Sequence, residues 1–178
     1  FHAGVMEGFK HEVIIAPKMA FGTGHHATTF MMLQAMSKLD FKGKRVFDFG
    51  CGTGILSVVA AMEGAERVVG VDIQPESKEN SYEHAMLNHV EPLCEFHEGG
   101  IEMADGEKYD IILANINVTI IAKYFEKLKE LLQPGGYLLL SGIMTYDKSY
   151  MEKNISFPPL EVIGQNDKND WMQITLKK

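Results

Sequence analysis

The sequence feature with the clearest chemical meaning is a GxGxG pattern formed by Gly50, Gly52 and Gly54. It directly follows the β-rich run 45–49 and precedes a run that is typical of a helix. Glycine allows a tight turn and a close approach of the backbone to a ligand, because it has no side chain. The next β-rich run ends about 20 positions later at Asp72, whose carboxylate can accept hydrogen bonds from both hydroxyls of a ribose. This combination predicts a binding site for an adenosine-containing ligand.

The spacing of the glycines distinguishes between adenosine cofactors. A dinucleotide fingerprint needs glycine or alanine at its sixth position, where this sequence has Ile55 or Ser57, counted from Gly50 or Gly52. The P-loop pattern of nucleoside triphosphate enzymes is absent from the sequence. GxGxG followed by a ribose-binding acid is instead typical of proteins that bind S-adenosyl-L-methionine, which becomes S-adenosyl-L-homocysteine. We therefore expect Gly50, Gly52 and Asp72 to contact S-adenosyl-L-methionine.

Short β-rich runs alternate with longer helical patterns from residue 45 onward. The predicted strands of this series are 45–49, 67–72, 94–97, 109–114 and 137–141. The predicted helices are 28–39, 55–62, 75–88 and 118–132. Strands that are apolar on both faces and separated by helices are typical of a parallel sheet with helices on both sides. Two further strands, 160–165 and 171–176, flank a turn and predict an appended antiparallel hairpin. The expected fold is a doubly wound, Rossmann-like α/β domain with a mostly parallel sheet.

Length and composition are those of one globular domain. Of the 178 residues, 46% are hydrophobic and 23% charged, which excludes an intrinsically disordered chain. The 17 Lys and Arg against 24 Asp and Glu give a net charge of −7, which argues against direct nucleic-acid binding. Cys51 and Cys94 belong to no CxxC pair, which favours a reducing, cytoplasmic location. The longest apolar run, 55–62, is far shorter than the ~20 residues that span a membrane.

Several segments resemble one family of methyltransferases. Residues 48–57 are similar to the first motif of class I methyltransferases. Residues 19–29, Met-Ala-Phe-Gly-Thr-Gly-His-His-Ala-Thr-Thr, resemble the signature loop of the PrmA family, the methyltransferases of large-subunit ribosomal protein eleven. Later motifs of the same family resemble residues 113–116, 131–136 and 140–143.

The resemblance to the PrmA family implies a protein-lysine N-methyltransferase that uses S-adenosyl-L-methionine. The cofactor contacts of the family fall on Thr29, Gly50, Asp72 and Asn115 of this sequence. The loop 21–26 would close over the cofactor and shape the path of the incoming amine. The implied partner is a basic ribosomal protein, methylated on lysine amines and, as a further option, on its N-terminal amine.

The resemblance also bears on domain organisation. We expect residues 1–178 to form a single catalytic domain, with 1–27 as an entry segment and cofactor-covering loop and 28–178 as the Rossmann-like core. Members of the family carry a separate N-terminal domain that recognises the ribosomal protein. The sequence begins with Phe1 rather than Met, and we expect that recognition domain to be absent from this chain.

Asn115 is the candidate catalytic residue. Its amide oxygen can accept a hydrogen bond from an incoming amine and orient the lone pair of the nitrogen. A lysine amine has a reference pKa near 10.4, and burial favours its neutral, nucleophilic form, so no general base is required. No metal site is expected, because the adjacent His25 and His26 have no acidic or cysteine partner at ligand spacing.

The same residues also allow simpler interpretations. The glycines can serve only as a strand-to-helix turn, Asp72 can cap the helix that follows it, and Asn115 can cap the helix that begins near residue 118. Two alternative functions fit the same pattern. One is an NAD-dependent oxidoreductase on the same sheet, and the other is an adenosine-binding domain without catalysis.

Overall fold

The computed structural model describes residues 12–16, 26–104 and 106–178 of the chain. The strands are β1 (Arg45–Phe49), β2 (Arg67–Asp72), β3 (Cys94–Glu98), β4 (Tyr109–Asn115), β5 (Leu132–Met144), β6 (Glu161–Lys168) and β7 (Trp171–Lys177). The α-helices are α1 (Ala27–Met36), α2 (Ile55–Met62), α3 (Pro75–Leu87), α4 (Val118–Leu131) and α5 (Lys148–Asn154). Short 3-10 helices are η1 (Glu91–Leu93), η2 (Ile101–Ala104) and η3 (Thr145–Asp147). Among the described helices, none combines the length and the hydrophobicity needed to cross a bilayer.

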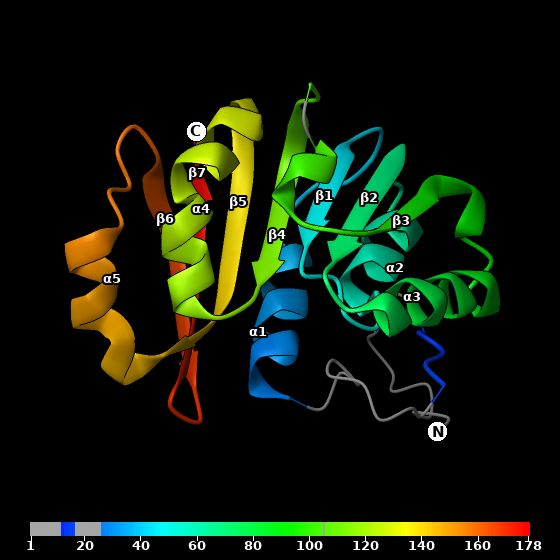
Figure 1. Ribbon diagram of the computed structural model, residues 1–178, viewed down its shortest axis with the longest axis horizontal. Helices are drawn as coiled ribbons and strands as arrows, with labels where there is room; N and C mark the ends of the chain where they lie inside the picture. The colour runs from blue at the N-terminus through cyan, green and yellow to red at the C-terminus, as the bar shows by residue number, and fades with distance from the viewer. Residues whose placement is uncertain (1–11, 17–25, 105) are drawn as a thin grey trace.

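The strands form one seven-stranded sheet in the order β3-β2-β1-β4-β5-β7-β6 (Figure 1). Strands β1 to β5 pair in parallel, and β7 pairs antiparallel with both β5 and β6. The chain runs outward from β1 to β3, then returns to place β4 on the other side of β1. The order of strands therefore reverses between β1 and β4, and ligands of open α/β sheets bind beyond the carboxyl ends of the strands at such a point.

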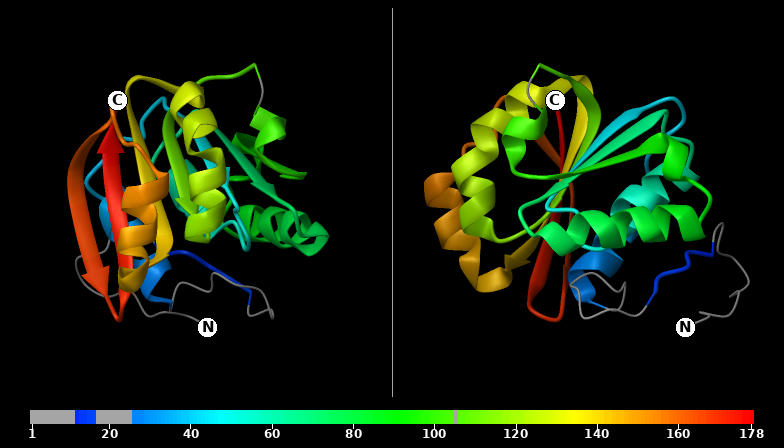
Figure 2. Two further views of the ribbon diagram at one scale, coloured as in Figure 1. Left: turned by 60° about the vertical axis from the view of Figure 1, so that its left-hand side comes forward. Right: turned by 45° about the vertical axis from the view of Figure 1, so that its right-hand side comes forward.

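Helices cover both faces of the sheet, as the two views of Figure 2 show. On one face, α1, α2 and α3 bury a core that includes Met32, Val58 and Ala85. On the other face, α4 and α5 bury a core that includes Phe125 and Met151. Successive residues of the central strands point alternately into the two cores, so these strands are apolar on both faces. This accounts for their continuous apolar runs in the sequence.

The observed architecture confirms the doubly wound α/β fold with a mostly parallel sheet and antiparallel C-terminal strands. Several elements differ from expectation: α1 ends at Met36 rather than residue 39, and β6 extends to Lys168, through most of the predicted turn 166–170. Helix α5 was not predicted, because its seven residues, Lys148–Asn154, bury only Met151 and give no amphipathic pattern. Strand β5 starts at Leu132 rather than residue 137, because Lys178 pairs with the Pro134–Gly136 region through its backbone, donating to the Gly136 carbonyl and accepting from Gly135.

The segment 12–16 is extended but joins no strand of the sheet. Its Ile14 is held by the side chain of Asn88, which accepts a hydrogen bond from the Ile14 N–H and donates one to the Ile14 carbonyl, both at 2.8 Å. Val13 and Ile15 pack against the core that α1, α2 and α3 bury on one face of the sheet. The predicted cofactor-covering loop, 21–26, lies outside the described residues except for His26.

Candidate active site

The three glycines form the turn between β1 and α2. Gly50, Gly52 and Gly54 have φ of +79°, +55° and +74°, a region that residues with a Cβ rarely adopt. The Gly50 N–H donates to the Val71 carbonyl at 2.8 Å, which ties the turn to the end of β2. A Cβ on Gly54 would lie 2.7 Å from the hydroxyl oxygen of Ser81 in α3. The turn is therefore compact and brings backbone, rather than side chains, to the carboxyl end of β1.

Asp72 links the glycine turn to the β2–α3 connection. Its Oδ2 accepts a hydrogen bond from the Gly52 N–H and its Oδ1 accepts one from the Gln74 N–H, both at 2.9 Å. Residue Gln74, not Asp72, is the N-cap of α3, and it makes no side-chain capping bond. Asp72 is thus a brace between two loops, and each of its carboxylate oxygens keeps further capacity to accept a hydrogen bond.

Asn115 ends β4 at the other side of β1. The alternative in which it caps α4 is wrong, because Asn117 is the N-cap and its Oδ1 accepts from the Thr119 N–H at 2.8 Å. The backbone next to Asn115 is fixed by β5, since the Ile116 N–H donates to the Ser141 carbonyl at 3.1 Å. The side chain of Asn115 is therefore free of the capping role that the sequence allowed.

Gly142 packs against the turn that follows Asn115, and it was not singled out from the sequence. It has a φ of +80° and lies where the β5–β7 register shifts between Leu140 and Ile143. A Cβ at this position would collide with the carbonyl oxygen of Ile116 and lie 2.8 Å from its carbonyl carbon. The bulge in β5 therefore requires glycine so that the Asn115–Ile116 backbone can pack directly on it. The signal in the sequence was a glycine inside an apolar strand pattern.

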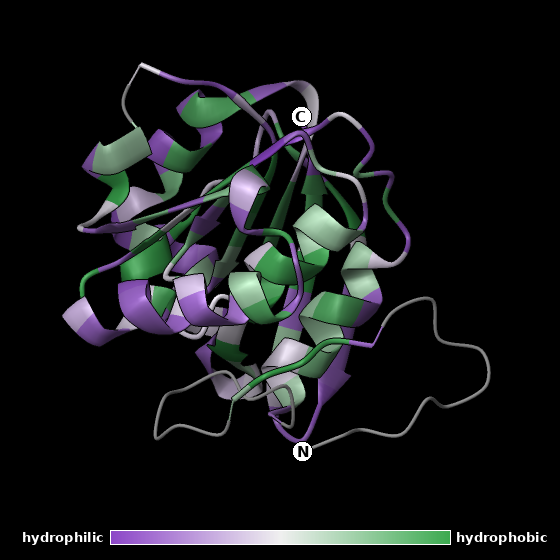
Figure 3. Ribbon diagram, turned by 90° about the vertical axis from the view of Figure 1, so that its right-hand side faces the viewer, coloured by the Kyte–Doolittle hydropathy of each residue, from purple (hydrophilic) through white to green (hydrophobic). Residues whose placement is uncertain are grey.

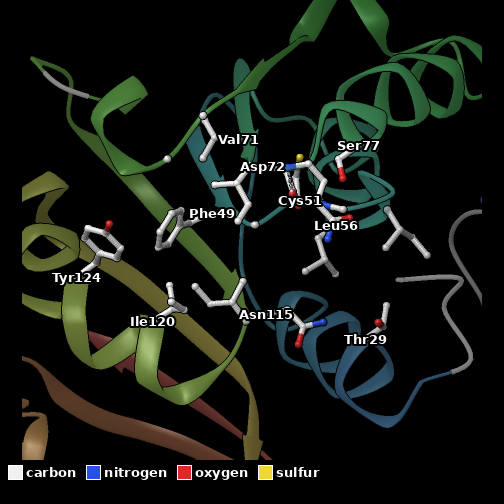
Figure 4. A pocket seen from close by; sticks show the side chains of 18 of the residues that line it. Thr29, Phe49, Cys51, Leu56, Val71, Asp72, Ser77, Asn115, Ile120 and Tyr124 are labelled. Atoms are coloured by element: carbon white, nitrogen blue, oxygen red, sulfur yellow. Dashed lines mark hydrogen bonds between the residues drawn. The ribbon is translucent and has the colours of Figure 1, made fainter. Parts of the chain in front are cut away.

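A cavity of about 460 Å³ opens beyond the carboxyl ends of β1, β2 and β4. Its polar lining includes Thr29, Gly50, Gly52, Asp72, Ser77 and Asn115, which brings all five predicted cofactor residues together. Figure 4 shows Thr29 and Asn115 on one side of the cavity, Asp72 with Ser77 on the opposite side, and an apolar wall made of Phe49, Ile120 and Tyr124. The cavity therefore has two polar regions separated by apolar surface, a shape suited to an elongated ligand with polar groups at both ends.

Two buried polar atoms of this cavity lack a hydrogen-bond partner within the described part of the chain. The hydroxyl oxygen of Thr29 and the amide Oδ1 of Asn115 have no hydrogen-bond partner among the described residues. Thr29 itself is 0% exposed, although it belongs to the first turn of α1. Leaving a buried polar atom unpaired costs about 1–3 kcal/mol, so native proteins retain such atoms where a ligand or an ordered water pairs with them.

Asp48 is a buried carboxylate just behind the glycine turn. Its Oδ2 accepts a hydrogen bond from the Ser57 hydroxyl at 2.6 Å, while its Oδ1 has no partner among the described residues. The pKa of Asp48 is raised from 3.8 to about 7, mainly by burial and to a smaller extent by the charge of Asp72, while the Ser57 hydrogen bond opposes the shift. Asp48 thus favours its neutral form in the folded protein at mildly acidic pH.

This pKa predicts how stability depends on pH. Because the folded-state pKa lies above the unfolded value, the stabilising contribution is full below pH 3.8 and is lost as pH rises toward about 7. Asp48→Asn mimics the neutral acid, so its unfolding free energy relative to wild type should rise by about 2–3 kcal/mol between pH 5 and pH 8. Urea unfolding at both pH values measures this, with exposed Asp167→Asn as the control. Parallel pH profiles for wild type and Asp48→Asn would contradict the assignment.

The other candidate groups have structural roles. His26 is the N-cap of α1, its ring contacts the Thr28 hydroxyl at 2.8 Å, and it packs edge-on against Trp171. Burial raises the pKa of the Cys51 thiol well above its ordinary value, so Cys51 lines the cavity as a protonated packing residue. Among the described residues, no group of three or more His, Cys, Asp or Glu is arranged to hold a metal ion.

The strand order, with an antiparallel β7 between β5 and β6, and the glycine turn facing an acid at the end of β2 together define the class I methyltransferase fold. A family model, "Ribosomal protein L11 methyltransferase (PrmA)", matches residues 6–178, and the chain belongs to this family.

Individual relatives agree with the family. The ribosomal protein L11 methyltransferase of Porphyromonas gingivalis is 38% identical over 160 residues, 90% of this chain and 55% of that protein. The corresponding protein of Phocaeicola vulgatus is 34% identical over 166 residues, 93% of this chain and 59% of that protein. The chain thus spans somewhat more than half the length of these curated relatives.

Solved structures show the same fold. The crystal structure of ribosomal protein L11 methylase from Lactobacillus delbrueckii subsp. bulgaricus matches with a TM-score of 0.85 and 25% identity, covering 96% of this chain and 88% of that one. An RNA methyltransferase from Salinibacter ruber, solved with S-adenosyl-L-homocysteine, matches with a TM-score of 0.66 at 18% identity, covering 83% and 89%. The second likeness concerns the fold alone.

Proposed function

We propose that this chain is the catalytic domain of an S-adenosyl-L-methionine-dependent methyltransferase that methylates lysine amines of ribosomal protein L11. The observation that carries the proposal is that Thr29 Oγ1 and Asn115 Oδ1 have no hydrogen-bond partner in the described part of the chain, at one side of a cavity whose other side Asp72 lines. Family membership supports the reaction and the substrate, because the curated relatives are named for both.

The residues present fit S-adenosyl-L-methionine. Asp72 offers carboxylate oxygens to the two ribose hydroxyls, and the apolar wall beside it suits a flat adenine ring. The glycine turn lets backbone, without side chains, approach the middle of the ligand. Thr29 and Asn115 then face the part of the cavity where the methionine moiety and the acceptor amine would lie. In that position their buried oxygens would gain the partners that they lack.

In the mechanism we infer, the bound cofactor supplies a methyl group already activated by its sulfonium. Asn115 Oδ1 accepts a hydrogen bond from an N–H of the incoming amine and so directs the nitrogen lone pair at that methyl group. The buried surroundings of Asn115 disfavour the ammonium form, so the amine sheds its proton to solvent before it is enclosed. Positioning and desolvation therefore take the place of a dedicated base.

The two alternative functions have less support. An NAD-dependent oxidoreductase needs a glycine or alanine where this chain has Ile55 or Ser57, and the family relatives are methyltransferases. A domain that only binds adenosine gives no reason for an Asn115 amide oxygen that is buried without a partner among the described residues, on the far side of the cavity from Asp72.

Replacing Asn115 tests the proposal. In Asn115→Ala we expect the kcat for methyl transfer to recombinant L11 to fall about 100-fold, because the amine loses its orienting acceptor. The unfolding free energy of the ligand-free protein should change by no more than about 1 kcal/mol, since the oxygen removed has no partner among the residues that the structure describes. Mass spectrometry of L11 measures the transfer, and urea unfolding measures stability.

Asn117→Ala is the matched control for this experiment. Asn117 is two residues away and exposed, and its loss removes the α4 cap at a cost of about 1 kcal/mol. We expect it to lower stability while leaving kcat within about twofold of wild type, the reverse of Asn115→Ala. No methylation of L11 by the wild-type chain would contradict the proposed function itself.

A further inference from the structure

The negative charge of the chain is concentrated in one segment. Residues 73–107 contain nine Asp and Glu against one Lys, a net charge of 1 − 9 = −8, whereas the whole chain carries −7. Five of these acidic residues lie in α3 and β3, which form one lateral edge of the molecule (Figure 1). Figure 3 looks onto this side and shows long hydrophilic stretches on its outer ribbon. Glu95 and Glu107 form ion pairs with Arg67 and Arg45, so the negative field at this edge comes mainly from its other carboxylates.

A groove of about 960 Å³ runs between the outer face of α3 and the end of β3. Its lining combines apolar side chains, Tyr82, Met86 and Leu87, with the carboxylates of Glu79, Glu83 and Glu98. Met86 is 61% exposed and Leu87 39% exposed, which is unusual for adjacent large apolar residues on a surface helix. Lys78 and His89 also line the groove. An apolar floor with acidic sides matches a segment that carries both apolar and basic side chains.

The groove adjoins the cofactor cavity but is separate from it. Pro75 and Glu98 line the groove, while their chain neighbours Gln74 and Gly99 line the cavity. The edge of β3 is partly covered, because the Phe96 N–H donates to the Tyr82 hydroxyl at 3.3 Å. A partner in the groove would therefore bind through side chains rather than by adding a strand to the sheet.

We propose that this groove docks a basic, amphipathic segment of the protein substrate, at a distance from the reacting amine. The inference rests on the proposed function, and it adds a second contact between enzyme and substrate. Charge favours this occupant, because a ribosomal protein is rich in Lys and Arg, while RNA would be repelled by the same carboxylates. The groove holds the substrate near the cavity and thereby raises the local concentration of its target amines.

Charge reversal in the groove tests the inference. In Glu79→Lys combined with Glu83→Lys we expect the KM for L11 to rise about tenfold, with weaker dependence on salt. The kcat and the KM for S-adenosyl-L-methionine should stay within about twofold, because neither residue lines the cavity. Met86→Ser removes part of the apolar floor without changing charge and should raise the KM for L11 about threefold. It also covers the case in which the charge-reversed protein does not fold.

The matched control is Glu152→Lys combined with Glu161→Lys. It makes the same change of charge on α5 and β6, at the opposite edge of the molecule (Figure 1). An unchanged KM for L11 in both groove variants, or an equal rise in the control, would overturn the docking proposal while leaving the proposed function intact. Loss of self-association with unchanged KM would assign the groove to a second copy of the chain instead. A wild-type chain that methylates no L11 would overturn the proposed function first.

Discussion

Gly142→Ala is expected to destabilise the protein by about 2–5 kcal/mol and to weaken S-adenosyl-L-methionine binding at least tenfold. A φ of +80° costs alanine about 1–2 kcal/mol, and the collision of its Cβ with the Ile116 backbone adds about 1–3 kcal/mol. The collision pushes away the turn that carries Asn115, so binding suffers as well as stability. Urea unfolding and a calorimetric titration measure the two effects.

Gly135→Ala is the matched control for Gly142→Ala. Gly135 lies in the same strand with a similar φ of +78°, but a Cβ there would meet nothing within 4 Å. We expect it to cost about 1–2 kcal/mol of stability and to leave cofactor affinity unchanged. If the two variants behave alike, backbone strain alone explains both results, and Gly142 has no part in placing Asn115.

Asp72→Ala is expected to weaken S-adenosyl-L-methionine binding by about 100-fold or more. Each hydrogen bond between a charged carboxylate and a ribose hydroxyl contributes about 1.5–3 kcal/mol, and two such bonds are lost. The variant also loses the acceptors for the Gly52 and Gln74 N–H groups, so the two loops become less ordered. A lower affinity of Asp72→Ala for the cofactor therefore does not by itself show whether Asp72 binds the ribose or only holds the two loops in place.

A cofactor analogue without the ribose hydroxyls separates the two roles of Asp72. If Asp72 binds the hydroxyls, the analogue should bind wild type much more weakly than the natural cofactor, yet bind Asp72→Ala about as well as the natural cofactor does. If the analogue loses the same affinity in both proteins, Asp72 acts as a brace only. Calorimetry with both ligands and both proteins completes the cycle.

The parts of the site that were predictable from the sequence are local in the chain. The glycine turn and Asp72 end consecutive parallel strands, and such strand ends meet at one edge of a sheet, so their proximity follows from the fold class. Positive φ at Gly50 and Gly52 likewise follows from the tightness of a strand-to-helix turn. The alternation of apolar runs was enough to place β1 to β4.

Other features depend on contacts between distant segments. Asn115 and Asn117 have the same side chain two residues apart, and only the start of α4 shows that Asn117 makes the cap. The role of Gly142 depends on the Ile116 backbone, which the β4–β5 pairing brings against it. Thr29 and Asn115 line one cavity because α1 packs against the sheet. The periodicity of apolar residues does not predict this packing. The family resemblance is what predicted that both residues contact the cofactor.

Calorimetric titration of the wild-type chain with S-adenosyl-L-methionine, with NADH as the parallel ligand, tests the central claim most directly. We predict saturable binding of one S-adenosyl-L-methionine per chain and no heat of binding with NADH. Binding of NADH, or of neither ligand, would contradict the assignment of the cavity between Asp72 and Asn115 as a methyl-donor site.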